Sequence, residues 1–137
     1  MKIALLFIFM AIFLIVCVDR SEGSSDDLSF KIKESLGNGV VDFRKIADFE
    51  WEKCYIFGPY TSAETIKREL KMDWDYAKKS AIHDADYYSL VVFVDNGKII
   101  RYFDHPAWNG NLGNLFRAGG YTPDNTVFIS DKDGICI

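Results

Sequence analysis

The sequence is poor in the residues that most often carry catalysis and metal binding. Its 137 residues include only three cysteines and two histidines, His83 and His105. Neither the stretch from His83 to Asp86 nor the Asp104–His105 pair has a metal-ligand spacing of known specificity. We therefore expect both histidines to be ordinary residues of surface loops. Glycine-rich phosphate loops, HExxH and GxSxG motifs are absent from the sequence. We therefore predict a protein that is not an enzyme and holds no metal or other cofactor.

Long basic clusters are missing as well. The net charge is −4, and no run of Lys and Arg exceeds two residues, as in Lys78-Lys79. Without the first 17 residues, which include Lys2, the chain has 15 basic and 20 acidic residues and a net charge of −5. Nucleic acid is therefore not expected as a partner.

The long hydrophobic run of the sequence lies at its N-terminus. Sixteen apolar residues, Ile3 to Val18, follow Lys2 and lead into a polar stretch. A membrane-spanning helix needs about 20 apolar residues, whereas a run of this length is near the upper end for a secretion signal. We interpret residues 1–23 as a signal segment with a short linker, and residues 24–137 as a single domain.

Three fates of this segment remain open. Leu14-Ile15-Val16-Cys17 resembles the bacterial lipobox, in which the cysteine is acylated, although Gly, Ala or Ser usually stands where Val16 does. Ser21-Glu22-Gly23 offers small residues for ordinary cleavage and secretion, and an uncleaved segment would be an N-terminal anchor. We predict lipidation at Cys17, and hence a cell-envelope protein held at the outside of the cytoplasmic membrane or secreted.

Two cysteines, Cys54 and Cys136, remain in the mature domain. An exported protein meets conditions that permit disulfides, so these two residues are candidates for a bridge. Two separate buried thiols are the alternative, because spacing alone does not assign a pair.

The pattern of apolar residues alternates between short helices and strands. Helical spacing and capping residues predict helices over 26–36 and 62–71, a weaker turn after Asp42, and a short helix near 74–80. Alternation predicts a strand over 49–57, and turn residues predict hairpins over 87–103, around Asn96-Gly97, and over 126–137. The fold class is α+β: a mainly antiparallel sheet of four or five strands with two to four short helices on one face.

The segment 106–125 is long for a loop in a small domain, which favours a function or a structural role of its own. In one interpretation, Leu112, Leu115 and Phe116 form a helical turn that closes the core. In the other, a binding surface is formed by Trp108, Asn109 and Asn111. Burial is the commoner outcome for large apolar side chains.

Two stretches of sequence carry a family resemblance. They are Phe49 to Thr61, with its Trp, Tyr, Phe and Pro-Tyr residues, and Val91 to Lys98, with Val-Phe-Val before Asn-Gly-Lys. Together they resemble a family of small uncharacterised bacterial exported proteins and lipoproteins, over about residues 40–103. The resemblance implies a bacterial envelope location and brings no activity or cofactor with it.

Three classes of function follow. The first is a non-catalytic envelope accessory protein that binds another envelope protein, through the aromatic strand-to-helix junction, with Trp51 and Tyr60, or through the Trp108 loop. The second is a secreted acidic inhibitor or immunity protein with a basic partner. The third is a glycan-binding protein or enzyme that uses a tryptophan as a stacking platform. We favour the first.

Overall fold

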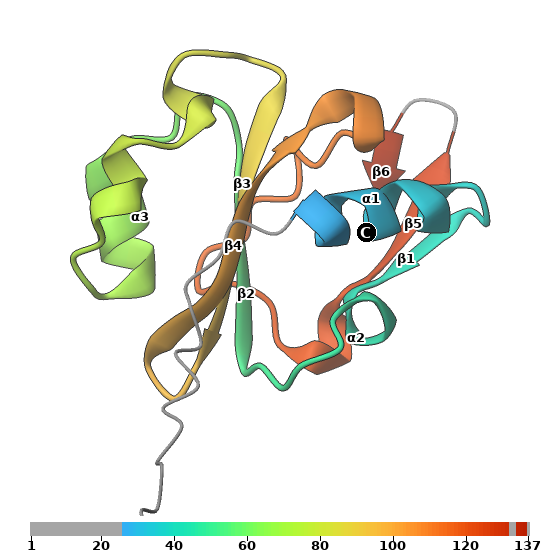
Figure 1. Ribbon diagram of the computed structural model, residues 1–137, viewed down its shortest axis with the longest axis horizontal. Coiled ribbons are helices and arrows are strands. Elements are labelled where there is room, and N and C mark those ends of the chain that lie inside the picture. The colour runs from blue at the N-terminus through green and yellow to red at the C-terminus, as the bar shows by residue number, and fades with distance from the viewer. Residues whose placement is uncertain (1–25, 132–133, 137) are drawn as a thin grey trace, which may run out of the picture.

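A central three-stranded antiparallel sheet separates two layers of the chain (Figure 1). The computed structural model describes residues 26–131 and 134–136. The sheet has the order β2-β3-β4, with β2 at Lys53–Phe57, β3 at Tyr88–Asp95 and β4 at Lys98–Pro106. One side carries α3 (Ala63–Leu70) and the 3-10 turns η1 (Asp75–Lys78) and η2 (Ala81–His83). The other side carries α1 (Asp26–Leu36), α2 (Phe43–Ile46) and a second sheet of order β1-β5-β6, formed by Val40–Asp42, Val127–Asp131 and Gly134–Cys136.

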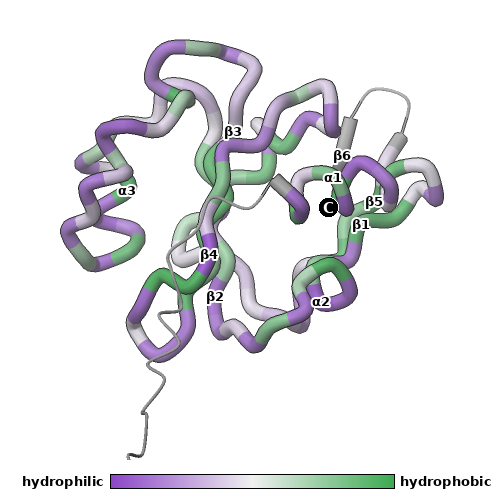
Figure 2. The backbone as a smooth tube through the Cα atoms, viewed as in Figure 1, coloured by the Kyte–Doolittle hydropathy of each residue, from purple (hydrophilic) through white to green (hydrophobic). Residues whose placement is uncertain are grey.

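Strand β3 is apolar on both faces because it lies between these layers. Val91 and Phe93 belong to the buried cluster on the α1 side, whereas Leu90 and Val92 belong to the cluster on the α3 side. Side chains alternate across a strand, so a strand covered on both faces needs apolar residues at every position. Figure 2 shows hydrophobic residues along the central strands, while α3 carries mainly hydrophilic ones. The run from Leu90 to Val94, apolar on both faces, predicts a central strand, and the order β2-β3-β4 confirms that position.

Several predicted elements are confirmed in detail. The turn between β3 and β4 has positive φ at Asn96 (50°) and Gly97 (70°), as a type I′ turn requires. Helix α1 covers the predicted residues 26–36. Helix α3 forms where expected, but its N-cap is Ser62, whose Oγ accepts from the Thr65 amide at 3.1 Å. The residues Thr61 to Glu64 match a capping box, which predicts Thr61 as the cap. Thr61 instead donates its hydroxyl to the Gly58 carbonyl.

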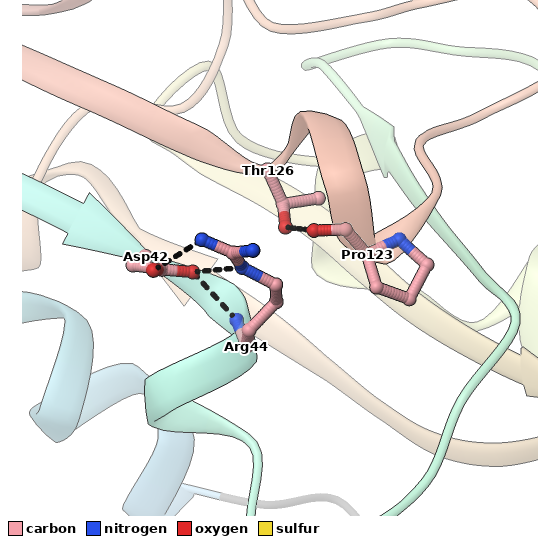
Figure 3. Close-up of polar contacts among 4 residues, drawn as sticks. All are labelled: Asp42, Arg44, Pro123 and Thr126. Atoms are coloured by element: carbon pink, nitrogen blue, oxygen red, sulfur yellow. Dashed lines mark hydrogen bonds and ion pairs between the residues drawn. The ribbon is translucent and has the colours of Figure 1, made fainter.

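Polar contacts join the second sheet to α2 (Figure 3). Asp42 caps this short helix by accepting from the Arg44 amide at 3.0 Å, and the Arg44 guanidinium contacts both of its carboxylate oxygens. These hydrogen bonds hold the pKa of Asp42 below its usual value. Nearby, the Phe43 amide donates to the Thr126 carbonyl, and the Thr126 hydroxyl donates to the Pro123 carbonyl. The predicted turn after Asp42 is thus confirmed as α2, tied to the start of β5.

The architecture differs from the expected one in four respects. The α+β class and the antiparallel pairing are confirmed, but the described strands form two sheets rather than one, and helices lie on both faces of the central sheet. The helix expected over 74–80 is the 3-10 turn η1. The strand expected over 49–57 begins only at Lys53. Phe49 and Trp51 pack with Cys54 on the α1 side, so strict alternation across the sheet does not extend to them.

Two predictions fall on parts of the chain outside the described residues. The signal segment 1–23, with Cys17, is one of them, and its lipidation stays a prediction. The final hairpin has its strands β5 and β6 where expected, while its turn residues 132–133 lie outside the described range. Among the residues that the structure describes, no helix is both long and apolar enough to cross a bilayer.

Candidate aromatic binding surface

Three aromatic side chains gather where β3 begins and β4 ends, and we call them the Trp108 cluster. The ring centroid of Trp108 lies 5.5 Å from that of Tyr87 and 5.9 Å from that of Tyr88, and the two tyrosine rings are 4.9 Å apart. Trp108 is 65% exposed and Tyr87 is 47% exposed, although aromatic side chains of this size are mostly buried in folded domains. The cluster therefore presents a contiguous apolar surface to the solvent.

Strand pairing brings these residues together. Tyr88 is opposite Pro106 in the β3–β4 register, and the Ala107 amide donates to the Tyr87 carbonyl at 2.7 Å. Directly after β4, residues Ala107–Asn109 form a single 3-10 turn, η3, which carries Trp108. The turn ends at Gly110, whose φ of 118° is costly for residues with a Cβ atom. The tryptophan is thus attached to the end of a paired strand, not to a free loop.

A hydrogen-bond network around the buried His105 side chain fixes this turn. His105 is fully buried in β4, with its Nε2 2.9 Å from the Gly110 carbonyl oxygen and its Nδ1 2.9 Å from the Ser29 hydroxyl of α1. Because a carbonyl only accepts, Nε2 carries the proton and Nδ1 accepts from Ser29. The Ser29 oxygen accepts in turn from the Asn109 amide nitrogen at 3.1 Å. The network ties α1, β4 and η3 into one unit.

Burial keeps the His105 imidazole neutral. It lowers the pKa of this side chain from 6.5 to about 4, against the opposing effect of the backbone contacts at Gly110 and Asn109. The prediction of a surface-loop position for His105 is therefore wrong. The ring is buried in β4, and both of its nitrogens form hydrogen bonds with protein groups in place of water. His83 is half-buried in η2, where its Nε2 contacts the Ala77 carbonyl.

The chemistry of the Ser29–His105 pair is that of a structural support. An activated serine needs an exposed hydroxyl and a histidine whose second nitrogen is oriented by a third group such as a carboxylate. Ser29 is buried, and the second nitrogen of His105 meets a backbone carbonyl. Within residues 26–131 and 134–136, no three His, Cys, Asp or Glu side chains are arranged to hold a metal ion.

The remaining residues predicted for a binding surface are distributed differently. Asn109 belongs to the network under Trp108, whereas Asn111 is exposed and accepts from the Gly113 amide at 2.9 Å. Tyr60 is 64% exposed at the strand-to-helix junction, with a φ of 61°. A Cβ atom added at Gly58 would lie 2.8 Å from the Gly113 carbonyl oxygen, so the junction and the loop are in direct contact.

Trp51 is not a surface residue. It is only 8% exposed, and its ring packs edge-on against Phe93 with a centroid separation of 5.2 Å. The prediction of a surface role for Trp51 is therefore wrong. Alternation placed Trp51 on the same side of a regular strand as Tyr55 and Phe57, but the chain before β2 is irregular and turns this ring to the opposite side, into the core with Cys54.

The long segment after β4 combines both interpretations offered by its sequence. Leu112 and Leu115 are buried, and the Tyr121 hydroxyl donates to the Leu115 carbonyl at 2.6 Å. Phe116 is 46% exposed, and the segment is a series of turns rather than a helix. Tyr121 pairs its backbone with Cys54 and so covers the edge of β2. Core closure and exposure of Trp108 therefore occur in the same segment.

Of the two alternatives for the cysteines, a disulfide bridge or separate buried thiols, the structure supports a separate thiol at Cys54. Cys54 is a free, fully buried thiol, and burial raises its pKa well above the ordinary value. The bridge considered for Cys54 is therefore not formed in this structure, in which the two cysteines belong to different sheets. The side chain of Cys136 lies outside the described residues.

Sequence reasoning missed Tyr87 and Tyr88, although a signal was present. Alignment of the two strands around the Asn96-Gly97 turn places Tyr88 next to Pro106, and hence next to the segment that carries Trp108. The exposed residues Asp84 and Asp86 precede Tyr87 in the chain and add negative charge to the segment that leads into the cluster. Comparisons with protein-family models, with curated proteins and with solved structures found no match for this chain.

Proposed function

We propose that this protein is a non-catalytic accessory protein of the bacterial cell envelope that binds another envelope protein through the Trp108 cluster. The observation that carries the proposal is the 65% exposure of Trp108 on a turn held by part-buried hydrogen bonds of His105 and Asn109. Exposed tryptophan and tyrosine are enriched among the residues that dominate binding energy at protein interfaces. The N-terminal export segment and Cys17 supply the envelope location in this proposal.

The support under the cluster favours binding over a structural role for these rings. A preorganised surface loses little conformational entropy on association, so more of its contact energy appears as affinity. Trp108 is held by a 3-10 turn, by the backbone bond between Ala107 and Tyr87, and by the Asn109–Ser29 contact. The pairing of a fixed backbone with exposed aromatic rings is the arrangement expected of a binding site.

Charge defines the chemistry of the proposed partner. The mature chain carries a net charge of −5, and the exposed residues Asp84 and Asp86 precede Tyr87 in the chain. A partner with an apolar centre and a basic rim would be complementary, and its association would slow as salt screens the attraction. An inhibitor of a basic protein, the second class of function, would use the same surface.

The proposal is tested by crosslinked affinity capture from the native envelope, with full-length protein and two variants. Trp108→Ala should reduce partner recovery at least about 10-fold, because truncation of an interface tryptophan often costs 2 kcal/mol or more. Tyr60→Ala is the matched control, because Tyr60 has almost the same exposure, 64%, but lies at the strand-to-helix junction. Its recovery should equal that of the wild-type protein.

Two outcomes would overturn the proposal. Equal partner recovery by wild-type protein and Trp108→Ala would remove the cluster from the interface. Loss of recovery with Tyr60→Ala alone would transfer binding to the junction predicted from the sequence. A thermal melt of each variant shows whether the fold is intact, so that unfolding is not mistaken for lost binding.

A further inference from the structure

A second group of aromatic rings surrounds a hollow on the α3 side of the central sheet, and we call it the Trp74 pocket. Its walls include Trp74, Tyr76 and Tyr102, with Asp73, Asp75 and Lys79 at the same opening. Ring centroids are separated by 5.4 Å between Trp74 and Tyr76, 4.9 Å between Trp74 and Tyr102, and 4.5 Å between Tyr76 and Tyr102. Each of the three rings is partly exposed.

The mutual orientation of these rings decides which ligand they suit. The interplanar angles are 42°, 81° and 47°, so the faces are inclined to one another and do not form one flat platform. Stacking of a sugar or nucleobase uses a flat ring face. Several inclined faces around a hollow are instead the arrangement in which proteins bind quaternary and methylated ammonium groups, which need no directed hydrogen bond.

A carboxylate positions Tyr76 and increases the electron density of its ring. Asp104 accepts from the Tyr76 hydroxyl at 2.6 Å, from the Ser80 hydroxyl and from the Ala81 amide. Burial and then this hydrogen bond raise the pKa of Tyr76 above its usual value, so the phenol stays protonated. A phenol that donates to an anion has a more negative ring face, which strengthens its attraction for a cation.

The charges at the opening are compatible with a monovalent cation. Asp73 pairs with Lys67 at 2.7 Å, whereas Asp75 has no ion pair with any other described residue. Lys79 opposes a cation by like-charge repulsion but is exposed, where solvent screens its charge. The aromatic faces supply the main attraction, and Asp75 adds a negative charge at the rim.

We propose that the Trp74 pocket binds an N-methylated ammonium group, held by the faces of Trp74, Tyr76 and Tyr102. This site is separate from the Trp108 cluster, and the inference does not depend on the proposed function. The ligand class includes small quaternary ammonium compounds and methylated amines carried by larger molecules, because the site recognises the ammonium head.

Choline and 3,3-dimethylbutan-1-ol provide a probe pair for this site. The two molecules have the same shape, but only choline carries a positive charge, so their difference isolates attraction of the aromatic faces for a cation. Titration calorimetry of the full chain in a non-ionic maltoside detergent should give at least about 10-fold tighter binding of choline. The N-methyl proton resonances of bound choline should shift upfield, because they lie over ring faces.

Four variants locate the site, and a fifth is their control. Trp74→Leu and Tyr102→Leu keep apolar bulk and remove aromatic faces, and each should weaken choline binding about 10-fold while binding of the neutral alcohol changes little. Tyr76→Phe keeps the ring but removes its bond to Asp104, and should weaken choline binding by a smaller factor. Lys79→Met should strengthen it. Trp108→Leu is the matched control and should bind choline as the wild-type protein does.

Clear results would overturn the inference. Equal affinity for choline and the neutral alcohol would make the pocket a simple apolar hollow. Failure of the wild-type chain to bind choline at a choline concentration of about 10 mM would also rule out the site. Binding of N-acetylglucosamine that is lost in Trp74→Leu, without choline binding, would identify a glycan site instead. The comparison of the two probes on wild-type protein needs no variant and is unaffected by misfolding.

Discussion

The buried imidazole of His105 predicts a specific loss of stability in mild acid. Its pKa is about 4 in the folded chain, compared with 6.5 for an exposed histidine, because burial disfavours the charged ring. The unfolded chain therefore binds more protons than the folded chain between these two values. Stability from this residue is complete above pH 6.5 and declines as the pH falls toward 4.

The magnitude follows from the two pKa values. One pKa unit corresponds to about 1.4 kcal/mol, so lowering the pH from 7 to 4 should remove about 3 kcal/mol of unfolding free energy through His105 alone. Carboxylates such as Asp42, whose pKa is also lowered in the folded state, likewise contribute less to the unfolding free energy as the pH falls. A variant without the imidazole is needed to separate the two contributions.

Urea denaturation of wild-type protein and His105→Gln at pH 7 and pH 4 makes this separation. Glutamine is neutral at both values and retains an N–H group that can donate to Gly110. The wild-type protein should lose about 3 kcal/mol more than the variant between the two conditions. Equal losses would refute the burial of a neutral imidazole at this position, as would an NMR titration of the wild-type His105 ring with a midpoint near 6.5.

The remaining predictions concern the core, the loop and the signal segment. Trp51→Ala should lower the unfolding free energy by about 3–5 kcal/mol and Trp108→Ala by less than about 1 kcal/mol, as measured by urea denaturation; equal losses would contradict their assigned burial. Gly120→Ala should cost at least about 2 kcal/mol in the same assay, because φ is 71° and a Cβ atom would lie 2.9 Å from the Cys54 carbonyl oxygen; a neutral effect would disprove this close approach. Cys17→Ser should remove acyl mass from the mature protein in mass spectrometry, whereas a soluble wild-type product beginning near residue 24 would exclude lipidation.

Local signals in the sequence predicted the elements that depend on local chemistry. Helix α1 follows from the spacing of Leu28, Ile32 and Leu36, and the β3–β4 turn follows from Asn96-Gly97. In both cases neighbouring residues determine the backbone conformation. The apolar residues on both faces of β3 likewise gave its central position.

The candidate site was predicted only in part because it depends on distant contacts. The buried His105 side chain accepts a hydrogen bond from Ser29, 76 residues earlier in the chain, and no local pattern around Asp104–His105 indicates that partner. Trp108 was singled out by composition, whereas Tyr87 joins it only through the register of two paired strands. The prediction for Trp51 was wrong for a related reason, because the orientation of its side chain depends on where the regular pairing of β2 begins.

The most direct test of the central claim is photo-crosslinking in living cells from single positions on the surface. A photoreactive phenylalanine analogue is placed at position 108, and in separate strains at positions 60 and 116, which carry other exposed aromatic residues. We predict one dominant crosslinked partner from position 108, reduced when Tyr87 is also replaced by alanine, and little product from the other two positions. A partner crosslinked equally well from all three, or from position 60 alone, would contradict binding through the Trp108 cluster.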